Sequence, residues 1–353
     1  MMTLRPSGVG LGEEYTAVSA LDGSMLHRSV MLSWEQLQAL ADIPTPIESP
    51  YWDLGELGSF LDRLADGLNR RRTALIHAMR HETGFIPSDC EEVFDGVLTL
   101  LRKFCAHDQT SAAPSPKPYF HDDRVIDFAD APWGSIAVIL PQNAFLYLAV
   151  TCLANALAAG NRVALRAPGQ SALSAALLAE TVQEAGAVPE IAAIVMAKSK
   201  EFVAAFQETS QPGLIHYMGS SRHAPSILAD SFRAGKSSLI DGDGNVLVYV
   251  GPDANPGDAA DLLTQGAIRY NGQTCTSING AIIHPDIYDE VRSALLQRWR
   301  ALTFGDTIEV PSVSVGPLLS SEQAQWCEAQ LAQSGGELLR GGKSARNILE
   351  PGL

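Results

Sequence analysis

The chain has 353 residues, of which 46% are hydrophobic and 18% charged, so it can bury a large core and is expected to form two domains. Its formal net charge of −15 argues against nucleic-acid partners, since phosphate binding needs clustered Lys and Arg, and it weighs against anionic membranes. Five widely spaced cysteines without a C-x-x-C pair argue against a disulfide framework or a zinc site, and they favour a reducing, cytoplasmic setting.

Residues 1–53 are predicted to form an irregular N-terminal segment, because prolines punctuate its second half. From residue 54 to about 105 the apolar side chains recur at helical spacing and predict helices. In this part His77 and His81 have the spacing of metal ligands on a helix, but no third ligand lies nearby in the sequence, so no metal site is expected.

From residue 135 onward, strand-like and helix-like segments alternate. Strands are predicted at 135–140, 162–166, 191–196, 214–218 and 246–250, with helices at 145–159, 172–185, 200–207 and 225–233. This alternation predicts an α/β fold with a Rossmann-like parallel sheet. The apolar run 136–159 resembles a membrane span, but Pro141, Gln142, Asn143 and Asn155 interrupt it, so a buried strand, turn and helix is expected.

A thiol in a polar turn is the most informative feature of the chain. Cys275 lies in Tyr270-Asn271-Gly272-Gln273-Thr274-Cys275-Thr276-Ser277, before a strand-like run. Reactive cysteines are displayed in this way, whereas core cysteines lie among apolar neighbours. A thiol attacks an aldehyde carbonyl to give a thiohemiacetal, and loss of hydride to an oxidised nicotinamide leaves a thioester. Taken alone, the turn equally permits a cysteine without a role.

Three upstream segments end strands with residues that suit a nucleotide site. Pro141-Gln142-Asn143 puts an amide where open α/β sheets bind ligands, and Asn143 is there either as an oxyanion donor or as a helix N-cap. Arg166 is placed to reach a ribose or a phosphate, or else it is a surface cation. Gly219-Ser220-Ser221 can turn backbone N–H groups toward a pyrophosphate, although such glycine turns are common.

Together, and in this order, these segments resemble the aldehyde dehydrogenase superfamily from about Leu57 to the C-terminus. The resemblance rests on His81-Glu82-Thr83-Gly84, Pro141-Gln142-Asn143, Gly160-Asn161 through Arg166-Ala167-Pro168, Gly219-Ser220-Ser221, Asn271-Gly272-Gln273-Thr274-Cys275, Gly305-Asp306 and Gly316-Pro317-Leu318.

The resemblance implies an NAD(P)-dependent oxidoreductase that acts on a small aldehyde. Cys275 would be the nucleophile, and Asn143 with the Cys275 backbone N–H would hold the oxyanion. The implied cofactor contacts are Pro141, Gln142, Arg166, Pro168, Gly169, Gly219, Ser220 and Ser221.

One departure concerns the general base. The family's Glu of an E-L-G-G segment is absent, and Asp241 is the only carboxylate that could substitute for it. The following Gly242-Asp243-Gly244-Asn245 resembles the G-x-G-N segment of CoA-acylating aldehyde dehydrogenases and acyl-phosphate reductases, which would add CoA as a ligand. The Gln273-Thr274-Cys275-Thr276 segment instead resembles the hydrolytic branch, so both resolutions of the thioester stay open.

A second departure concerns the cofactor. Gly169 stands where NAD-preferring members often carry a Glu for the ribose diol. Without that carboxylate a 2′-phosphate is not repelled, and Arg166 would attract it. We therefore expect NADP to be tolerated or preferred over NAD.

The third departure is the end of the sequence at Glu350-Pro351-Gly352-Leu353, about where the family reads E-P-T with more to follow. We thus expect residues 54–250 to form the helical part and the Rossmann-like dinucleotide-binding domain, and 251–353 an incomplete α/β catalytic domain. The full family fold implies a homo-oligomer, which a shortened chain need not form. A shortened chain also leaves open a hypothesis of another class, a non-catalytic nucleotide-binding remnant.

Overall fold

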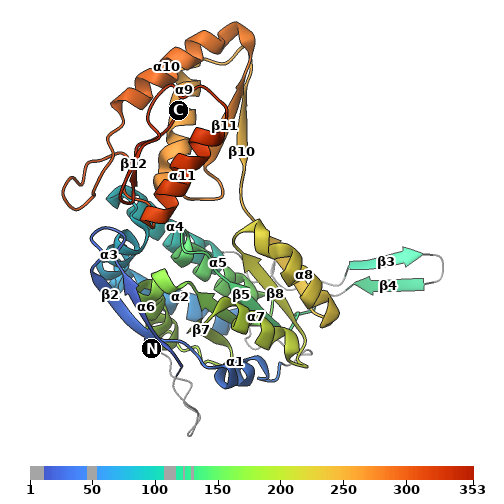
Figure 1. The fold of residues 1–353 in the computed structure, drawn as a ribbon. Coiled ribbons are helices and arrows are strands. Elements are labelled where there is room, and N and C mark those ends of the chain that lie inside the picture. The colour runs from blue at the N-terminus through green and yellow to red at the C-terminus, as the bar shows by residue number, and fades with distance from the viewer. Residues whose placement is uncertain (1–11, 46–53, 107–116, 122–123, 129–130) are drawn as a thin grey trace. The chain divides into compact units, whose positions relative to one another are not determined.

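The structure is a computed structural model that describes residues 12–45, 54–106, 117–121, 124–128 and 131–353. The chain divides into two compact units (Figure 1). The first comprises the described parts of residues 1–17, 27–75 and 93–242, and the second comprises residues 18–26, 76–92 and 243–353.

A parallel sheet forms the centre of the first unit. Its five strands run in the order β7-β6-β5-β8-β9, and every neighbouring pair is parallel. Their bounds are β5 Ser135–Ile139, β6 Arg162–Ala167, β7 Ala192–Met196, β8 Gly213–Met218 and β9 Ser237–Asp241. All residues of β5 and β7 are buried, as expected for parallel strands covered on both faces. The predicted α/β fold with a parallel sheet is confirmed.

Helices cover both faces of this sheet. The crossover helices are α5 (Phe145–Ala158), α6 (Ala172–Glu184), α7 (Ser199–Glu208) and α8 (Ala224–Arg233). On one face α1 (Trp34–Ala41) packs on α7, and both contribute to an apolar core with Ala137, Ile139 and Ile215 of the sheet. α2 (Leu54–Arg70) packs on α5 and α6. Because the strand order reverses around β5, the carboxyl ends of β5 and β8 form the topological switch point, where such sheets bind ligands.

The apolar run at 136–159 forms β5, a turn and α5. Among the residues that the structure describes, no helix is both long and apolar enough to cross a membrane.

The N-terminal segment differs from the prediction of an irregular stretch. β1 (Glu14–Val18) and β2 (Met25–Val30) form a two-stranded sheet, and α1 follows. α1 begins with a capping box in which Ser33 accepts from the Gln36 backbone N–H and the Gln36 side chain accepts from the Ser33 N–H. This Ser-x-x-Gln pattern is a readable helix start that the sequence analysis passed over. Pro46 and Pro50 of this segment lie outside the described residues.

Four further elements belong to this part of the chain. α3 (Arg72–Thr83) and α4 (Pro87–Ala106) continue the predicted helical stretch, and β3 (Lys117–His121) pairs antiparallel with β4 (Arg124–Phe128). β3 and β4 are not among the strands predicted from the sequence.

The second unit contains a smaller parallel pair, β10 (Val246–Val250) and β11 (Ile278–Ile283). α9 (Pro256–Ile268) connects them, α10 (Tyr288–Ala301) packs on α9, and Val250, Leu263 and Val291 form the core between them. α11 (Ser321–Gln333) contacts the short pair β12 (Ser344–Ala345) and β13 (Ile348–Leu349). The last passage of the chain from the first unit to the second falls between residues 242 and 243. The domain boundary between 250 and 251 stays a prediction.

Candidate active site

The turn that carries Cys275 is built on an unusual backbone. After α9, Tyr270 and Asn271 take left-handed conformations, with φ of 53° and 55°, and Gly272 follows at 67°. Only glycine adopts this region freely, so the two larger residues store strain of about 1–3 kcal/mol each that the surroundings must offset.

The Asn271 side chain provides that support within the second unit. It is buried, and its Nδ2 donates to the carbonyl oxygens of Gly84 and Pro317, both at 2.9 Å. Its Oδ1 accepts from the Gly316 backbone N–H at 2.8 Å. The amide thus pairs two carbonyls and one N–H from two distant loops, and it fixes the turn in place.

Gln273 ties the next step of the turn to the same loops. Its Nε2 donates to the Thr83 carbonyl at 3.3 Å, and its Oε1 accepts from the Leu319 N–H at 3.2 Å. Thr274 and Ser277 then close a tight turn around Cys275, with their hydroxyl oxygens 2.9 Å apart and the Ser277 N–H donating to the Thr274 carbonyl. Cys275 is therefore exposed on a turn in which the side-chain amides of Asn271 and Gln273 are both hydrogen-bonded to other loops.

Gly244 lies directly against this turn. A Cβ at this position would stand 1.7 Å from the Cys275 carbonyl oxygen and 2.9 Å from its Cα. No side chain fits there, so the glycine of the Gly242-Asp243-Gly244-Asn245 segment is required by close backbone approach.

Burial separates Cys275 from the other cysteines whose side chains are described. Burial raises the pKa of the Cys90 thiol to about 12, and that of Cys152 also to about 12. It raises the pKa of the half-buried Cys327 as well. A thiolate is the nucleophilic form, so these three positions are unsuited to attack, whereas Cys275 is accessible. The side chain of Cys105 lies outside the described residues.

In the first unit, Pro141-Gln142-Asn143 follows β5 at its carboxyl end, and all three residues are half-buried. α5 begins at Phe145, with Ala144 as its N-cap residue and no side-chain capping bond. Asn143 is therefore not the N-cap of this helix. Its assignment as an oxyanion donor stays a prediction.

Arg166, Pro168 and Gly169 lie at the carboxyl end of β6. Arg166 is half-buried, and its Nε donates to the Ala197 carbonyl at 3.0 Å, so it is held against the sheet rather than free in solvent. Burial lowers the pKa of its guanidinium, and the nearby Tyr15 acts in the opposite direction. Beyond Pro168, Gly169 opens a short 3-10 turn, η1 (Gly169–Ser171).

Gly219-Ser220-Ser221 leads from β8 into η2 (Ser221–His223) and α8. The Gly219 N–H donates to the Asp241 carbonyl at 3.0 Å, and the Tyr217 hydroxyl donates to the Ser220 carbonyl at 3.1 Å. These bonds fix the loop at the switch-point end of the sheet, where a helix start follows it.

The edge of this sheet fits a dinucleotide in its chemistry. Gly169 and Gly219 lack side chains, so the Tyr15 and Tyr217 phenol groups approach their backbones closely, and Arg166 supplies a cation. In the described residues, the buried Ser171 Oγ and Gln170 Oε1 beside Gly169 meet no hydrogen-bond partner, which leaves polar atoms for a ligand to satisfy. No group of three His, Cys, Asp or Glu side chains suited to a metal ion occurs in the described chain.

Asp241 ends β9, and a residue that the sequence analysis missed accompanies it. The His216 Nε2 of β8 lies 2.7 Å from the Asp241 Oδ2; the His216 side chain is 15% exposed and that of Asp241 60%. Asp241 is paired with Met218 in the sheet, so His216, two residues earlier, shares its face. The strand register was needed to see this pair.

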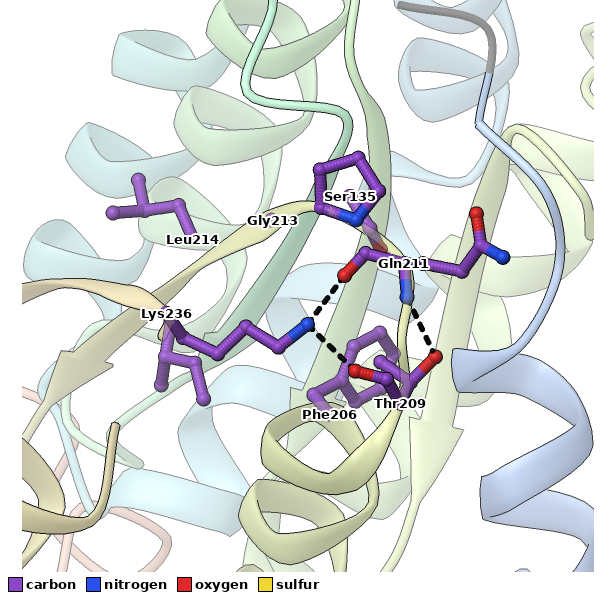
Figure 2. A pocket seen from close by; sticks show the side chains of 9 residues that line it. Ser135, Phe206, Thr209, Gln211, Gly213, Leu214 and Lys236 are labelled. Carbon is purple, nitrogen blue, oxygen red and sulfur yellow. Dashed lines mark hydrogen bonds between the residues drawn. The ribbon is translucent and has the colours of Figure 1, made fainter. Parts of the chain in front are cut away.

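A small hollow of about 10 Å³ lies at the opposite, amino end of the sheet (Figure 2). There the Lys236 ammonium donates to the Gln211 carbonyl and, at 2.7 Å, to the Thr209 carbonyl. The hollow has room for about one water molecule. It is a structural feature of the strand starts and takes no part in the candidate site.

The structure thus gathers Asn143, Arg166, Gly169, Gly219-Ser220-Ser221 and Asp241 at the carboxyl ends of one parallel sheet. In the second unit it displays one accessible thiol. A parallel sheet with glycine turns and an arginine at its carboxyl ends belongs to the open α/β class, and Cys275 on its anchored turn is the candidate nucleophile.

Comparison with known proteins specifies the class. The aldehyde dehydrogenase family matches residues 50–353, and the chain belongs to that family. Alpha-ketoglutaric semialdehyde dehydrogenase of Bacillus subtilis (strain 168) is 25% identical over 296 residues, which are 83% of this chain and 60% of that protein. The chain therefore spans less than two thirds of that relative's length.

Two solved structures show the same fold at low sequence identity. Mycobacterium tuberculosis aldehyde dehydrogenase complexed with NAD+ has a TM-score of 0.89 and 19% identity, covering 100% of this chain and 74% of its own. An E. coli NADP dependent enzyme has a TM-score of 0.87 and 20% identity, covering 96% of this chain and 72% of its own. Both nicotinamide cofactors therefore occur among proteins of this fold.

Proposed function

We propose that the protein is an NAD(P)-dependent oxidoreductase that oxidises a small aldehyde. The observation that carries the proposal is the turn that exposes Cys275. Its left-handed backbone is strained, and the hydrogen bonds of Asn271 hold it in place. Membership of the aldehyde dehydrogenase family and the cationic edge of the sheet support it.

In the proposed reaction, the Cys275 thiolate forms a C–S bond with the aldehyde carbon, and the carbonyl electron pair moves onto oxygen. The Asn143 amide and the Cys275 backbone N–H donate hydrogen bonds to that oxyanion. Bound NAD(P) supplies the acceptor for the hydride that leaves carbon, and a thioester on Cys275 results. Arg166, Gly169 and the Gly219-Ser220-Ser221 loop would hold the dinucleotide, together with Pro141, Gln142 and Pro168.

For hydrolysis of the thioester, we propose that Asp241 accepts a proton from the attacking water. His216 holds the carboxylate at 2.7 Å and fixes its orientation. The water oxygen then bonds to the acyl carbon, the C–S bond breaks, and the thiolate of Cys275 is restored.

A second candidate is a CoA-acylating aldehyde dehydrogenase or an acyl-phosphate reductase, in which CoA or phosphate replaces water. One observation favours it. Gly244 of the Gly242-Asp243-Gly244-Asn245 segment lies against the Cys275 backbone carbonyl, so this segment packs on the turn that carries the thiol.

The test is aldehyde-dependent formation of NADH or NADPH, with and without CoA, for the unaltered chain and for Cys275→Ala. The panel of aldehydes should include alpha-ketoglutaric semialdehyde, the substrate in the name of the Bacillus relative. Cys327→Ala is the matched control, since Cys327 is a half-buried thiol on α11.

We expect turnover that disappears in Cys275→Ala and persists in Cys327→Ala. Turnover that requires CoA would select the second candidate. Equal turnover in both variants would end the proposal. Dinucleotide binding without turnover of any aldehyde would favour a non-catalytic nucleotide-binding protein.

A further inference from the structure

The N-terminal strand β1 lies beside the carboxyl ends of β6 and β7 in the first unit. The Leu32 N–H, just beyond β2, donates to the carbonyl of Met196, the last residue of β7, at 2.8 Å. The Met31 N–H donates to the Glu13 carbonyl at 2.9 Å, and the Glu13 carboxylate pairs with the Lys198 ammonium at 2.8 Å. Backbone and side-chain contacts therefore hold the start of β1 at this edge of the sheet.

Tyr15 of β1 occupies the space above Gly169. A Cβ on Gly169 would stand 2.5 Å from the Tyr15 Cζ, 2.6 Å from its hydroxyl oxygen and 2.9 Å from its Cε1. The phenol end of the ring thus fills the volume that a side chain at residue 169 would take. A glutamate at position 169 could enter only if Tyr15 moved away.

The positive charge of Arg166 also acts on the Tyr15 phenol. Burial raises the pKa of the Tyr15 phenol, and the Arg166 guanidinium partly opposes that rise. The phenol therefore remains protonated at neutral pH and keeps an O–H to donate. A neutral donor next to a guanidinium is a set of groups that suits an anionic phosphate oxygen.

We propose that Tyr15 is the residue that determines cofactor specificity, by donating its hydroxyl hydrogen bond to the 2′-phosphate of NADP beside Arg166. This inference rests on the proposed dinucleotide site at the edge of the sheet. In this proposal Tyr15 of β1 contacts the cofactor from the position that a side chain at residue 169 would otherwise occupy.

The experiment is calorimetric titration of the full chain with NADP+, NAD+, adenosine 2′,5′-bisphosphate and 5′-AMP. The variants are Tyr15→Phe, which removes only the hydroxyl, and Tyr15→Ala, which removes the ring. Tyr249→Phe is the matched control, because Tyr249 is 67% exposed on β10 of the second unit. Thermal melting of each variant verifies that it is folded.

We expect Tyr15→Phe to weaken NADP+ and adenosine 2′,5′-bisphosphate about tenfold, the usual effect of losing a hydrogen bond to a charged group. NAD+ and 5′-AMP should change by less than about twofold, within the range of neutral surface changes. Tyr249→Phe should bind all four ligands as the unaltered chain does.

Equal weakening of phosphorylated and unphosphorylated ligands, or no change in either, would overturn the inference and leave the proposed function standing. Tighter binding by Tyr15→Ala would overturn it as well, since the ring would then obstruct the site. If the unaltered chain bound none of the four ligands, the dinucleotide site and the role of Tyr15 would fail together. Tyr15-dependent binding without aldehyde turnover would instead contradict the catalytic proposal alone.

Discussion

The candidate functional residues of the first unit and those of the second unit are held in place in different ways. In the second unit, the Cys275 turn is fixed by two buried or half-buried amides that reach loops far away in sequence. In the first unit, the carboxyl ends of the strands are positioned by the sheet itself, and individual side chains such as Asp241 remain exposed. A strained turn needs specific side-chain hydrogen bonds, whereas the ends of strands are positioned by the backbone hydrogen bonds of the sheet. Substitutions should therefore affect stability most in the second unit.

The largest expected effect on stability comes from Asn271→Asp. The substitution keeps the shape and the acceptor for Gly316, but it turns a carboxylate oxygen toward the carbonyls of Gly84 and Pro317. Loss of two buried donors should lower the free energy of unfolding by about 3 kcal/mol or more. Chemical denaturation measures this. Asn155→Asp on the exposed face of α5 is the control, and an equal loss there would contradict the special role of Asn271.

The next effect is that of Gly244→Ala. The added methyl would overlap the Cys275 carbonyl oxygen, so the turn must shift, at a cost of about 1–3 kcal/mol. The rate of Cys275 alkylation should change with it. Gly336→Ala offers a matched comparison, because the nearest atom to its Cβ would be 3.7 Å away. If Gly244→Ala matched Gly336→Ala and the unaltered chain in stability and in the rate of Cys275 alkylation, the close packing of Gly244 on the turn would not matter for either.

The buried thiols predict a pH dependence. Burial holds the pKa of Cys90 at about 12 in the folded chain, against an ordinary value of 9.0. As pH rises through this interval the unfolded chain loses the proton first, so stability falls from about pH 9 upward. At pH 8 a group with that pKa is ionised about one time in ten thousand, so iodoacetamide should label Cys275 and spare Cys90 until unfolding. Mass spectrometry of labelled peptides checks this, and fast native labelling of Cys90 would contradict it.

The smallest effect on stability is expected for Asp241→Asn. Its carboxylate is 60% exposed, so loss of the pair with His216 should change the free energy of unfolding by less than about 1 kcal/mol. Turnover limited by thioester hydrolysis should nevertheless fall, while Cys275 still acylates. Rapid-quench analysis separates the two steps. Unchanged hydrolysis would remove Asp241 from the mechanism, and His216→Gln should give a milder decrease if the histidine only positions the carboxylate.

Sequence patterns predicted the parallel sheet well because buried parallel strands are continuous apolar runs, as β5 and β7 are. Once the strands are known, their carboxyl ends follow, and with them the placement of Asn143, Arg166 and Gly219. The accessible thiol was readable because polar, glycine-containing neighbours mark a turn. These features are local in sequence.

What the sequence did not reveal depends on contacts between distant residues. The pairing of His216 with Asp241 requires the register of β8 against β9. The partners of Asn271 lie near residues 84 and 316, and no spacing rule connects them. Tyr15 belongs to a strand within the stretch predicted to be irregular, so its position above Gly169 is visible only in three dimensions.

The Asn271-Gly272 dipeptide has a consequence for the chemical ageing of the protein. An asparagine before glycine deamidates when the glycine nitrogen attacks the side-chain carbonyl carbon and expels ammonia. The resulting succinimide is hydrolysed by water to isoaspartate or aspartate at residue 271. In the folded chain both ends of that amide are engaged in hydrogen bonds, so the side chain cannot rotate to be attacked. The bonds that display the thiol therefore also protect the turn from deamidation. Any condition that loosens the turn should therefore speed deamidation at Asn271 and also change the reactivity of Cys275.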